Sequence, residues 1–295
     1  MNWLILGLCV IWGFNFVIMK LGNDVFSPVM FAALRFSFGT VVLIAVLLIR
    51  KIQLPSKRQL KWYVVCGLLQ TTYFNIAIQV SLNYISSGLT SVLTYSMPLF
   101  LSIMAHYFIP GEKLNMLKMI GISLGIAGLI LAMDVQTGGN VLIPLFALSS
   151  AVAWALSNVI LKTKLSGSNP IQFTAWQMGI GSILLFLYSF SFEDIRVQWS
   201  AEAITYLLYS GIIASALAFV IWSYVLSKVA ASKASISLLI VPLVGTLCGV
   251  IFLKENLQAI TIVGIVLVLA GVMLVNLKQS SHPVVQKREL KKQKV

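Results

Sequence analysis

The sequence predicts an all-α integral membrane protein whose ten transmembrane helices form two inverted five-helix repeats. Three observations predict this class. Hydrophobic residues make up 59% of the 295-residue chain and charged residues only 10%, whereas charged residues are about 25% of an average soluble domain. The apolar residues fall into runs of roughly 20, long enough to cross the hydrocarbon core of a bilayer. Finally, motifs of the first half return in the second half.

Ten apolar runs follow one another along the chain, separated by short polar segments that often contain Pro, Gly, Asn or Ser. Each run predicts one helix, because a helix rises about 1.5 Å per residue and the hydrocarbon core is about 30 Å thick. In order, the predicted helices cover residues 2–21, 29–49, 62–81, 88–109, 115–133, 141–161, 170–191, 203–226, 234–253 and 258–277.

The basic residues predict the orientation of these helices. Segments between consecutive helices alternate between the two sides of the membrane, and the segments on one side hold only Arg196 and Lys254. Cytoplasmic segments carry the excess of Lys and Arg, so both termini are expected in the cytoplasm. The net charge of +13 thus reflects the lipid bilayer and predicts no nucleic-acid partner. The other Lys and Arg residues concentrate in 50–61, 110–118, 162–169, 227–233 and the tail 278–295, which we expect to be disordered.

The repeat begins with WGFNFVIMK, residues 12–20, which returns as WALSNVILK, residues 154–162. It predicts two copies of one unit, residues 1–133 and 141–277. Five is an odd number of crossings, so the second copy is inverted in the membrane, as in many secondary transporters. Further matched pairs, with small shifts in spacing, are Gly39 and Gly181, Gly67 and Gly211, Pro98 and Pro242, and Glu112 and Glu255.

Several motifs in order resemble the EamA-type carriers of the drug/metabolite transporter superfamily. They are WGFNFVIMK, SPVMFAALRF, SSGLTSVLTYSMPLFLSIMAHYFIPGEKL, and AASKASISLLIVPLVGTLCGVIFLKENL followed by GIVLVLAGVML. The resemblance implies a cavity lined by helices 1, 3, 4, 6, 8 and 9, a bacterial inner-membrane location and, commonly, export. Two residues depart from the family pattern: His106 stands where an apolar or aromatic residue is usual, and Gln177 takes the position that Arg35 has in the first copy.

The repeated motif supplies candidate cavity residues in helices 1 and 6. Trp12 and Asn15 recur as Trp154 and Ser157, with Asn158 beside them. Polar amides within hydrocarbon need partners or a wet cavity. We therefore expect these residues to line the cavity; the alternative is that Asn15 and Ser157 join helices by hydrogen bonds.

Helix 3 carries a polar stripe. Thr71, Asn75 and Gln79 are four residues apart and share one helix face. Lipid is a poor neighbour for this stripe, so it must face protein or water, and we expect it to line the cavity. In helix 8, its counterpart, Trp222 is the matching candidate.

Helices 4 and 9 add Ser91, Tyr95 and Ser235 as candidate cavity residues. Pro98 and Pro242 lie about ten residues into these two predicted helices. A proline inside a helix removes one backbone hydrogen bond and kinks it. Each kink is either a hinge or a static bend.

Two basic residues lie within the predicted helices. Arg35 in helix 2 is predicted to be a structural charge that locks the helix to the bundle, with Asp24 or polar groups of helices 4 and 9 as partners. A functional charge, or a side chain that reaches outward to water, is the alternative. Lys20 is expected to reach the membrane interface.

Two glycine pairs, Gly121 with Gly125 and Gly245 with Gly249, have the small-x-x-x-small spacing that lets helices approach closely. The contacts they predict are either within one chain or between two chains, so a homodimer is one interpretation.

Residues that would carry chemistry are scarce. None of the eight acidic residues lies at the centre of a predicted helix, which argues against a cation/proton exchanger and favours uncoupled transport. His106 is the alternative coupling group. The three cysteines lack the spacing of a disulfide or metal site. We expect no catalytic residues, no metal and no cofactor.

These features lead to one functional hypothesis. The protein is expected to be a carrier that exports a small-molecule substrate, an amino acid or derivative, by alternating access. A multidrug or other metabolite efflux carrier, a membrane sensor or scaffold, and a channel are the alternatives.

Overall fold

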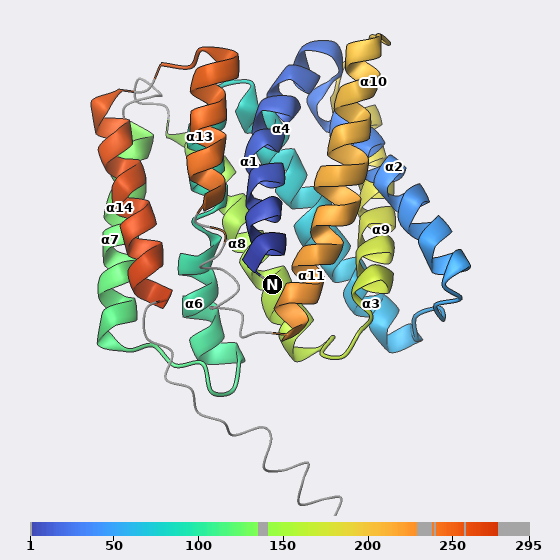
Figure 1. Ribbon diagram of the computed structural model, residues 1–295, viewed down its shortest axis with the longest axis horizontal. Helices are drawn as coiled ribbons and strands as arrows, with labels where there is room; N and C mark the ends of the chain where they lie inside the picture. The colour runs from blue at the N-terminus through green and yellow to red at the C-terminus, as the bar shows by residue number, and fades with distance from the viewer. Residues whose placement is uncertain (1, 135–140, 229–237, 239, 257, 277–295) are drawn as a thin grey trace, which may run out of the picture.

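A computed structural model describes residues 2–134, 141–228, 238, 240–256 and 258–276. These residues form a bundle of helices joined by short loops (Figure 1). Within the described ranges, the only β pairing is an isolated antiparallel bridge between Phe26 and Val197. The fold is therefore all-helical, as the sequence predicts.

Eight helical stretches are long and apolar enough to cross a membrane by length and composition, and two shorter apolar helices follow them. For the ninth predicted helix, only residues 238 and 240–253 are described, so the count of ten remains a prediction. In chain order the elements are α1 (Asn2–Val25), α2 (Pro28–Ile49), α3 (Lys57–Cys66), η1 (Gly67–Tyr73), α4 (Phe74–Leu82), α5 (Ser87–Thr94), α6 (Met97–Phe108), α7 (Met116–Asp134), α8 (Leu142–Thr163), α9 (Pro170–Phe192), α10 (Ala201–Leu208), η2 (Tyr209–Leu217), α11 (Ala218–Lys228), α13 (Ile240–Leu253) and α14 (Ala259–Asn276).

Local sequence signals set several helix starts. Ser56 and Gln59 form a reciprocal capping box at the start of α3. Asn169 accepts hydrogen bonds from two backbone N–H groups at the start of α9. Pro28 and Pro170 occupy the first turn of α2 and α9, where a missing N–H costs no helical hydrogen bond.

The α7–α14 pair packs through glycines at one side of the molecule (Figure 1). A Cβ atom on Gly121 would lie 2.6 Å from the carbonyl oxygen of Gly271, and one on Gly128 would lie 2.7 Å from that of Gly264. Gly125 packs against Leu99 of α6 as well as against Gly271 of α14. These small residues are thus used for contacts within the chain.

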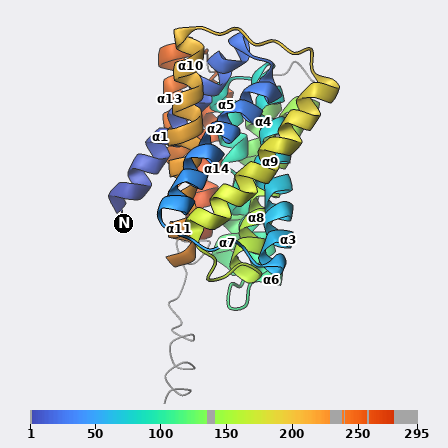
Figure 2. The same ribbon diagram turned by 90° about the vertical axis from the view of Figure 1, so that its right-hand side faces the viewer.

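Two further crossings surround the centre of the bundle. α2 crosses η2 where a Cβ atom on Gly39 would lie 2.7 Å from the carbonyl oxygen of Gly211. α9 crosses η1 in a similar way, because a Cβ atom on Gly67 would lie 2.8 Å from the carbonyl oxygen of Gln177. In the side view, α9 runs obliquely past α3 (Figure 2). Both crossings need glycine for the backbones to come this close.

η1 and η2 are π-helical segments, wider turns with i→i+5 hydrogen bonds that interrupt otherwise α-helical spans. The wider turn changes which side chains meet. The Asn75 side chain lies 3.4 Å from the Gln70 carbonyl oxygen, five residues earlier, and 2.7 Å from that of Thr71. An α-helical reading of the sequence does not predict these segments.

The predicted fourth helix is broken in two. α5 ends at Thr94 and α6 begins at Met97. Pro98 lies in the first turn of α6, and the interruption that it predicts takes the form of a two-residue turn, Tyr95 and Ser96, within the stretch Ser87–Phe108. The Ser96 hydroxyl donates to the Leu93 carbonyl at 2.6 Å, in addition to the Ser96 backbone N–H at 3.4 Å, and this closes the turn at the break. Pro242 lies in the first turn of α13; most residues before it are outside the described ranges.

A loop of the second half binds the start of α2. The Glu193 carboxylate accepts hydrogen bonds from the backbone N–H groups of Val29 and Met30 at 2.8 and 3.0 Å. Ser27 donates its backbone N–H to the Arg196 carbonyl at 2.9 Å. A carboxylate at a helix N-terminus is favourable because the unpaired N–H groups there carry partial positive charge. This loop therefore ties α2 firmly to the second half.

Replacing Gly271 by Ala is expected to destabilise the fold, because the new methyl group would lie 2.5 Å from backbone atoms of Gly121 and Gly125. Overpacking of this kind costs about 1–3 kcal/mol. The measurement is the melting temperature in detergent. Gly7→Ala is the matched control, since nothing lies within 4 Å of its new methyl group. Equal melting temperatures for Gly271→Ala and wild type would contradict the packing described for α7 and α14.

Candidate functional site

A small cavity lies among the central helices. Its volume is about 30 Å³, roughly the share of one water molecule in the liquid. Most of its wall is aromatic or aliphatic, and three polar side chains interrupt that wall. The lining residues are Trp12, Asn15, Phe16, Met19, Arg35, Phe36, Phe74, Asn75, Ile78, Tyr95, Trp154, Ala214 and Phe219.

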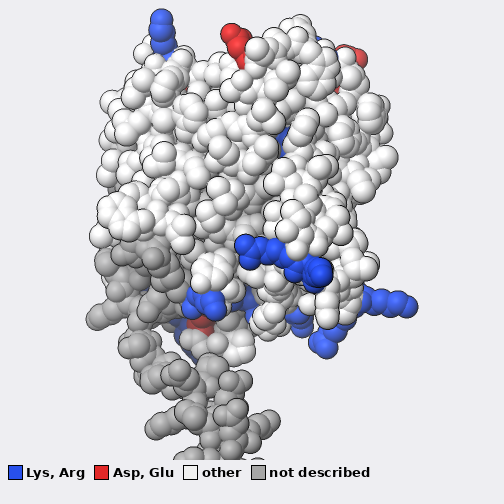
Figure 3. Space-filling model, turned by 45° about the vertical axis from the view of Figure 1, so that its right-hand side comes forward, with Lys and Arg blue, Asp and Glu red and all other residues white. Residues whose placement is uncertain are grey.

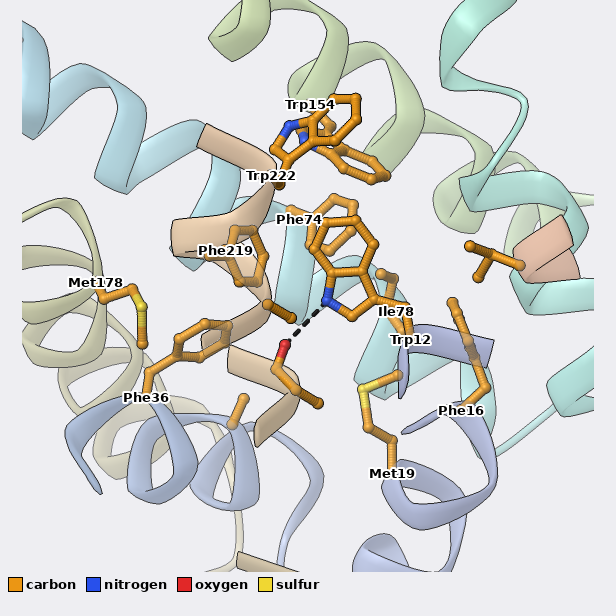
Figure 4. Packing of buried hydrophobic residues seen from close by; sticks show 14 of the residues in the cluster. Trp12, Phe16, Met19, Phe36, Phe74, Ile78, Trp154, Met178, Phe219 and Trp222 are labelled. Atoms are coloured by element: carbon orange, nitrogen blue, oxygen red, sulfur yellow. Dashed lines mark hydrogen bonds between the residues drawn. The ribbon is translucent and has the colours of Figure 1, made fainter. Parts of the chain in front are cut away.

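Aromatic rings close the cavity around Trp12 (Figure 4). The Trp12 ring meets Trp154 edge to face, with centroids 5.7 Å apart, and Phe219 at 5.4 Å. Trp154 also contacts Tyr95 at 5.3 Å and Phe74 at 5.4 Å. Edge-to-face pairs at these separations are favourable beyond the burial of area. The rings come from both halves of the sequence, so the cavity lies where the halves meet.

A π-helical carbonyl orients the central indole. Trp12 donates its Nε1–H to the Ala214 carbonyl of η2 at 2.9 Å. The Nε1–H of Trp154 is buried and has no hydrogen-bond partner. The two indoles therefore differ: the N–H of Trp12 has a partner, and that of Trp154 is available to an acceptor on a ligand.

The amides of the repeated motif are paired within the protein. Asn15 accepts a hydrogen bond from Ser210 at 2.6 Å and also lines the cavity. Asn158 accepts from the Trp222 indole at 3.3 Å and is absent from the cavity wall. Ser157 donates to the Gln70 amide oxygen at 2.7 Å. Asn15 thus lies on the wall of this cavity and also joins α1 to η2, whereas Ser157 and Asn158 join helices away from it.

The polar stripe of helix 3 divides in the same way. Asn75 lines the cavity. Thr71 donates instead to Gln177 of α9 at 2.6 Å. Gln79 donates to Asn23 and to the Pro28 carbonyl at 3.1 and 3.0 Å. Two of the three stripe residues thus connect helices away from the cavity.

Arg35 has partners that the sequence analysis does not predict. Its guanidinium donates to the Asn75 amide oxygen and, at 3.4 Å, to the Ser215 hydroxyl. Its carbon Cζ lies 4.5 Å from the centroid of the Phe36 ring. The prediction of Asp24 or of groups in helices 4 and 9 as partners is wrong, because the wide turns of η1 and η2 direct Asn75 and Ser215 toward α2. Arg35 is only 3% exposed, so it does not reach outward to water.

Of the eleven residues predicted to line the path, the structure brings five to this cavity. Ser91 donates to the Gly88 carbonyl and packs against Gly245. Trp222 lies outside the cavity wall and bonds to Asn158. Ser235 is outside the described residues. Whether any of them binds substrate stays a prediction. The five cavity residues are Trp12, Asn15, Asn75, Tyr95 and Trp154.

Sequence reasoning missed several cavity residues, notably Phe16, Phe36, Phe74 and Phe219. They are apolar residues on apolar helices, so no sequence signal separates them from ordinary core positions. The resemblance also implied a lining without helix 2, whereas α2 contributes Arg35 and Phe36.

An ion pair joins the two halves at one end of the bundle. Lys20 Nζ lies 2.9 Å from Glu255 Oε1, a partner that the sequence analysis does not predict. The Glu255 carboxylate also accepts from the Ser87 backbone N–H at 2.8 Å and from the Ser87 hydroxyl at 2.9 Å. Burial raises the pKa of Glu255, but the bonds from Ser87 and Lys20 outweigh it and hold that pKa below its usual value. The pair is partly sheltered, since Lys20 is 32% exposed.

His106 lies at the far end of α6 and is not part of the cavity wall. Its Nδ1 accepts a hydrogen bond from the Leu114 backbone N–H at 3.3 Å. No group of three or more His, Cys, Asp or Glu side chains that could hold a metal ion occurs within the described ranges.

The long apolar helices define the class, a multi-pass membrane protein, and a small cavity lies where the two halves of its sequence meet. The EamA-like transporter family matches residues 1–133 and 141–277. The chain therefore belongs to the EamA-like transporter family.

Similar proteins support this family membership. The chain is 31% identical to the uncharacterized transporter YoaV of Bacillus subtilis, over 92% of this chain and 94% of that protein. It is 28% identical to a probable amino-acid metabolite efflux pump of Escherichia coli, over 90% of this chain and 91% of the other. One known crystal structure has a TM-score of 0.70 and 18% identity, covering 93% of this chain and 96% of its own, so it shares the fold.

Glu255→Gln is expected to lower the melting temperature at neutral pH and to reduce its loss in acid. Because the pKa of Glu255 is lowered in the folded protein, its charge stabilises the fold above the usual glutamate pKa of about 4.3. That contribution is lost as pH falls through the lowered pKa. Melting curves between about pH 3 and pH 7 measure the effect. Glu202→Gln, at an exposed position in α10, is the control. If both variants melt alike at every pH, the Lys20–Glu255 pair does not stabilise the fold.

Proposed function

We propose that this protein is a secondary carrier of the bacterial inner membrane that exports an amino acid or a close derivative by alternating access. The observation that carries the proposal is the aromatic cavity, built from both halves of the sequence, together with the ion pair that joins those halves at one end. A cavity of about 30 Å³ is too small for an amino acid, so the helices must separate to admit one.

The proposed architecture is ten helices in two inverted five-helix repeats, residues 1–133 and 141–277. Reciprocal contacts support it. Gly39 meets Gly211 where α2 crosses η2, and the matching Gly181 meets Gly67 where α9 crosses η1. Arg35 bonds to Ser215 and the matching Gln177 bonds to Thr71. Positions that repeat in the sequence thus make equivalent contacts, as inverted repeats require.

The distribution of charge supports a cytoplasmic location for both termini. On the face in Figure 3, Lys and Arg gather at the lower end, which is the end where α3 begins in Figure 1. Basic residues favour the cytoplasmic side of a membrane protein. Export from the cytoplasm then runs from this end toward the end that holds Lys20 and Glu255.

The substrate class is proposed from two sources. The Escherichia coli relative is named as a probable amino-acid metabolite efflux pump, and the aromatic wall with amide groups suits a molecule that has both apolar and polar parts. Multidrug or other metabolite efflux is the second candidate, favoured by the predominantly apolar lining. A homodimer remains a proposal without a described surface assigned to it.

The proposal is tested by the flux of radiolabelled amino acids in proteoliposomes, with and without an imposed pH gradient. We expect saturable flux that does not need the gradient, because the cavity wall holds no carboxylate or histidine. Trp12→Ala should reduce the flux at least about tenfold, since loss of one buried aromatic contact and hydrogen bond exceeds about 1.4 kcal/mol.

Trp3→Ala is the matched control for that flux. Trp3 lies on the same helix but is 84% exposed, so its replacement should leave the flux unchanged. Equal flux for wild type and Trp12→Ala would remove the cavity from the transport path. Flux that requires the pH gradient would contradict uncoupled transport.

Thiol accessibility tests the transport path directly. Single cysteines at Trp12, Asn15, Asn75 and Tyr95, in a background without Cys9, Cys66 and Cys248, should react with a water-soluble maleimide when the carrier cycles. A cysteine at Leu89, which is fully buried outside the cavity, should stay unlabelled. If all four cavity positions stay unlabelled from both sides of the membrane, they do not line the path.

A further inference from the structure

Arg35 is a buried cation at the cavity whose bonds all go to neutral groups. Its hydrogen-bond acceptors are the Asn75 amide oxygen and the Ser215 hydroxyl. Its Nε–H is buried and has no partner. In the part of the chain that the structure describes, no carboxylate pairs with it. A buried charge without a counter-charge is costly within a membrane protein and calls for an explanation.

The matching position of the second half shows that packing does not need this charge. Gln177 is fully buried where α9 crosses η1, and it bonds to Thr71 of η1 as Arg35 bonds to Ser215 of η2. Gln177 is not part of the cavity wall, whereas Arg35 is. A neutral amide is therefore enough to join the two helices at such a crossing. The charge is present only at the crossing whose residue, Arg35, also lies on the cavity wall.

The neighbour of Arg35 is itself held in place. Asn75 donates through Nδ2 to the Thr71 carbonyl at 2.7 Å and to the Gln70 carbonyl at 3.4 Å. This leaves its amide oxygen directed at the guanidinium. The π-helical segment η1 supplies both carbonyls, so the backbone orients Asn75 and Asn75 orients Arg35.

The rest of the cavity lacks a second charge. Arg35 lies over the Phe36 ring, and the same wall includes Phe74, Ile78 and Phe219 together with Trp12 and Trp154. No carboxylate on that wall could receive an ammonium group. The cavity thus offers one cationic end and an aromatic interior.

We propose that Arg35 binds the carboxylate of the transported molecule, so that the substrate is a small organic carboxylate with an aromatic or large apolar body. The inference rests on the proposed function of the same cavity. A guanidinium presents parallel N–H donors to both oxygens of a carboxylate, and the free Nε–H of Arg35 is one such donor. The body of the substrate packs against the aromatic rings. A free amino group is not required, because it gains no ion pair in this site.

Binding to the purified full-length protein in detergent, measured by isothermal titration calorimetry, tests this assignment. The probes are N-acetyl-L-phenylalanine, its neutral amide N-acetyl-L-phenylalaninamide, and L-phenylalanine. We expect the N-acetyl carboxylate to bind at least tenfold more tightly than the amide, and at least as tightly as phenylalanine. Equal binding of carboxylate and amide, or no binding of the carboxylate, would overturn the assignment without any variant.

Arg35→Gln, which copies the residue at position 177, should abolish the preference for the carboxylate while the amide binds as before. Arg35→Lys keeps the charge without the paired donors and should retain a reduced preference. Arg50→Gln, at an exposed position after α2, is the control and should keep the full preference. A full preference in Arg35→Gln would show that another group binds the carboxylate.

Flux measurements separate this inference from the proposed function. Binding with the expected preference but without flux in proteoliposomes would overturn the carrier and leave Arg35 as an anion site. Saturable flux of amide and carboxylate at equal rates and affinities would overturn the role of Arg35 and leave the carrier.

Discussion

Close backbone contact at glycines is the constraint on which the rest of this structure depends. In a bilayer, helices gain little from burying apolar side chains against each other, so close packing and interhelical hydrogen bonds must hold the bundle together. Gly39, Gly67, Gly181 and Gly211 bring α2 and α9 against the π-helical segments. At that distance Arg35 reaches Ser215 and Gln177 reaches Thr71. The cavity exists because these crossings hold its polar wall in place while aromatic rings fill the centre.

Much of the fold could be predicted from the sequence, because apolar length and the positions of Lys and Arg respond directly to the bilayer. The candidate site was less predictable. Trp12 and Trp154 could be found since the repeat marks them, but Phe74 and Phe219 look like any apolar helix residue. The partners of Arg35 could not be found either, because a helix with 3.6 residues per turn does not reveal the wider turns of η1 and η2. The form of the interruption at Tyr95 and Ser96 could not be predicted, because Pro98 fits both a kink and a new helix start.

Charged side chains of the described residues differ in whether they have a partner of opposite charge or partial charge. Lys20 with Glu255, and Glu193 with the start of α2, are satisfied within the protein and join its two halves at one end. Arg35 has only neutral partners, and it is the charged residue at the cavity wall. The paired charges stabilise one arrangement of the helices, whereas a charge without a counter-ion can still form an ion pair with an anionic ligand.

The attachment of α2 by Glu193 has a consequence for how the molecule can move. α2 follows α1 in the sequence, but its N-terminus is fixed to the loop after α9, and its length packs on α9 and η2. Only the short turn at Phe26 and Ser27 connects α1 to α2. In the alternating access that we propose, a swing of one half against the other carries α2 along with α9, and that turn acts as the pivot. The body that we propose to move then differs from the first predicted repeat, residues 1–133, because α2 moves with the second half.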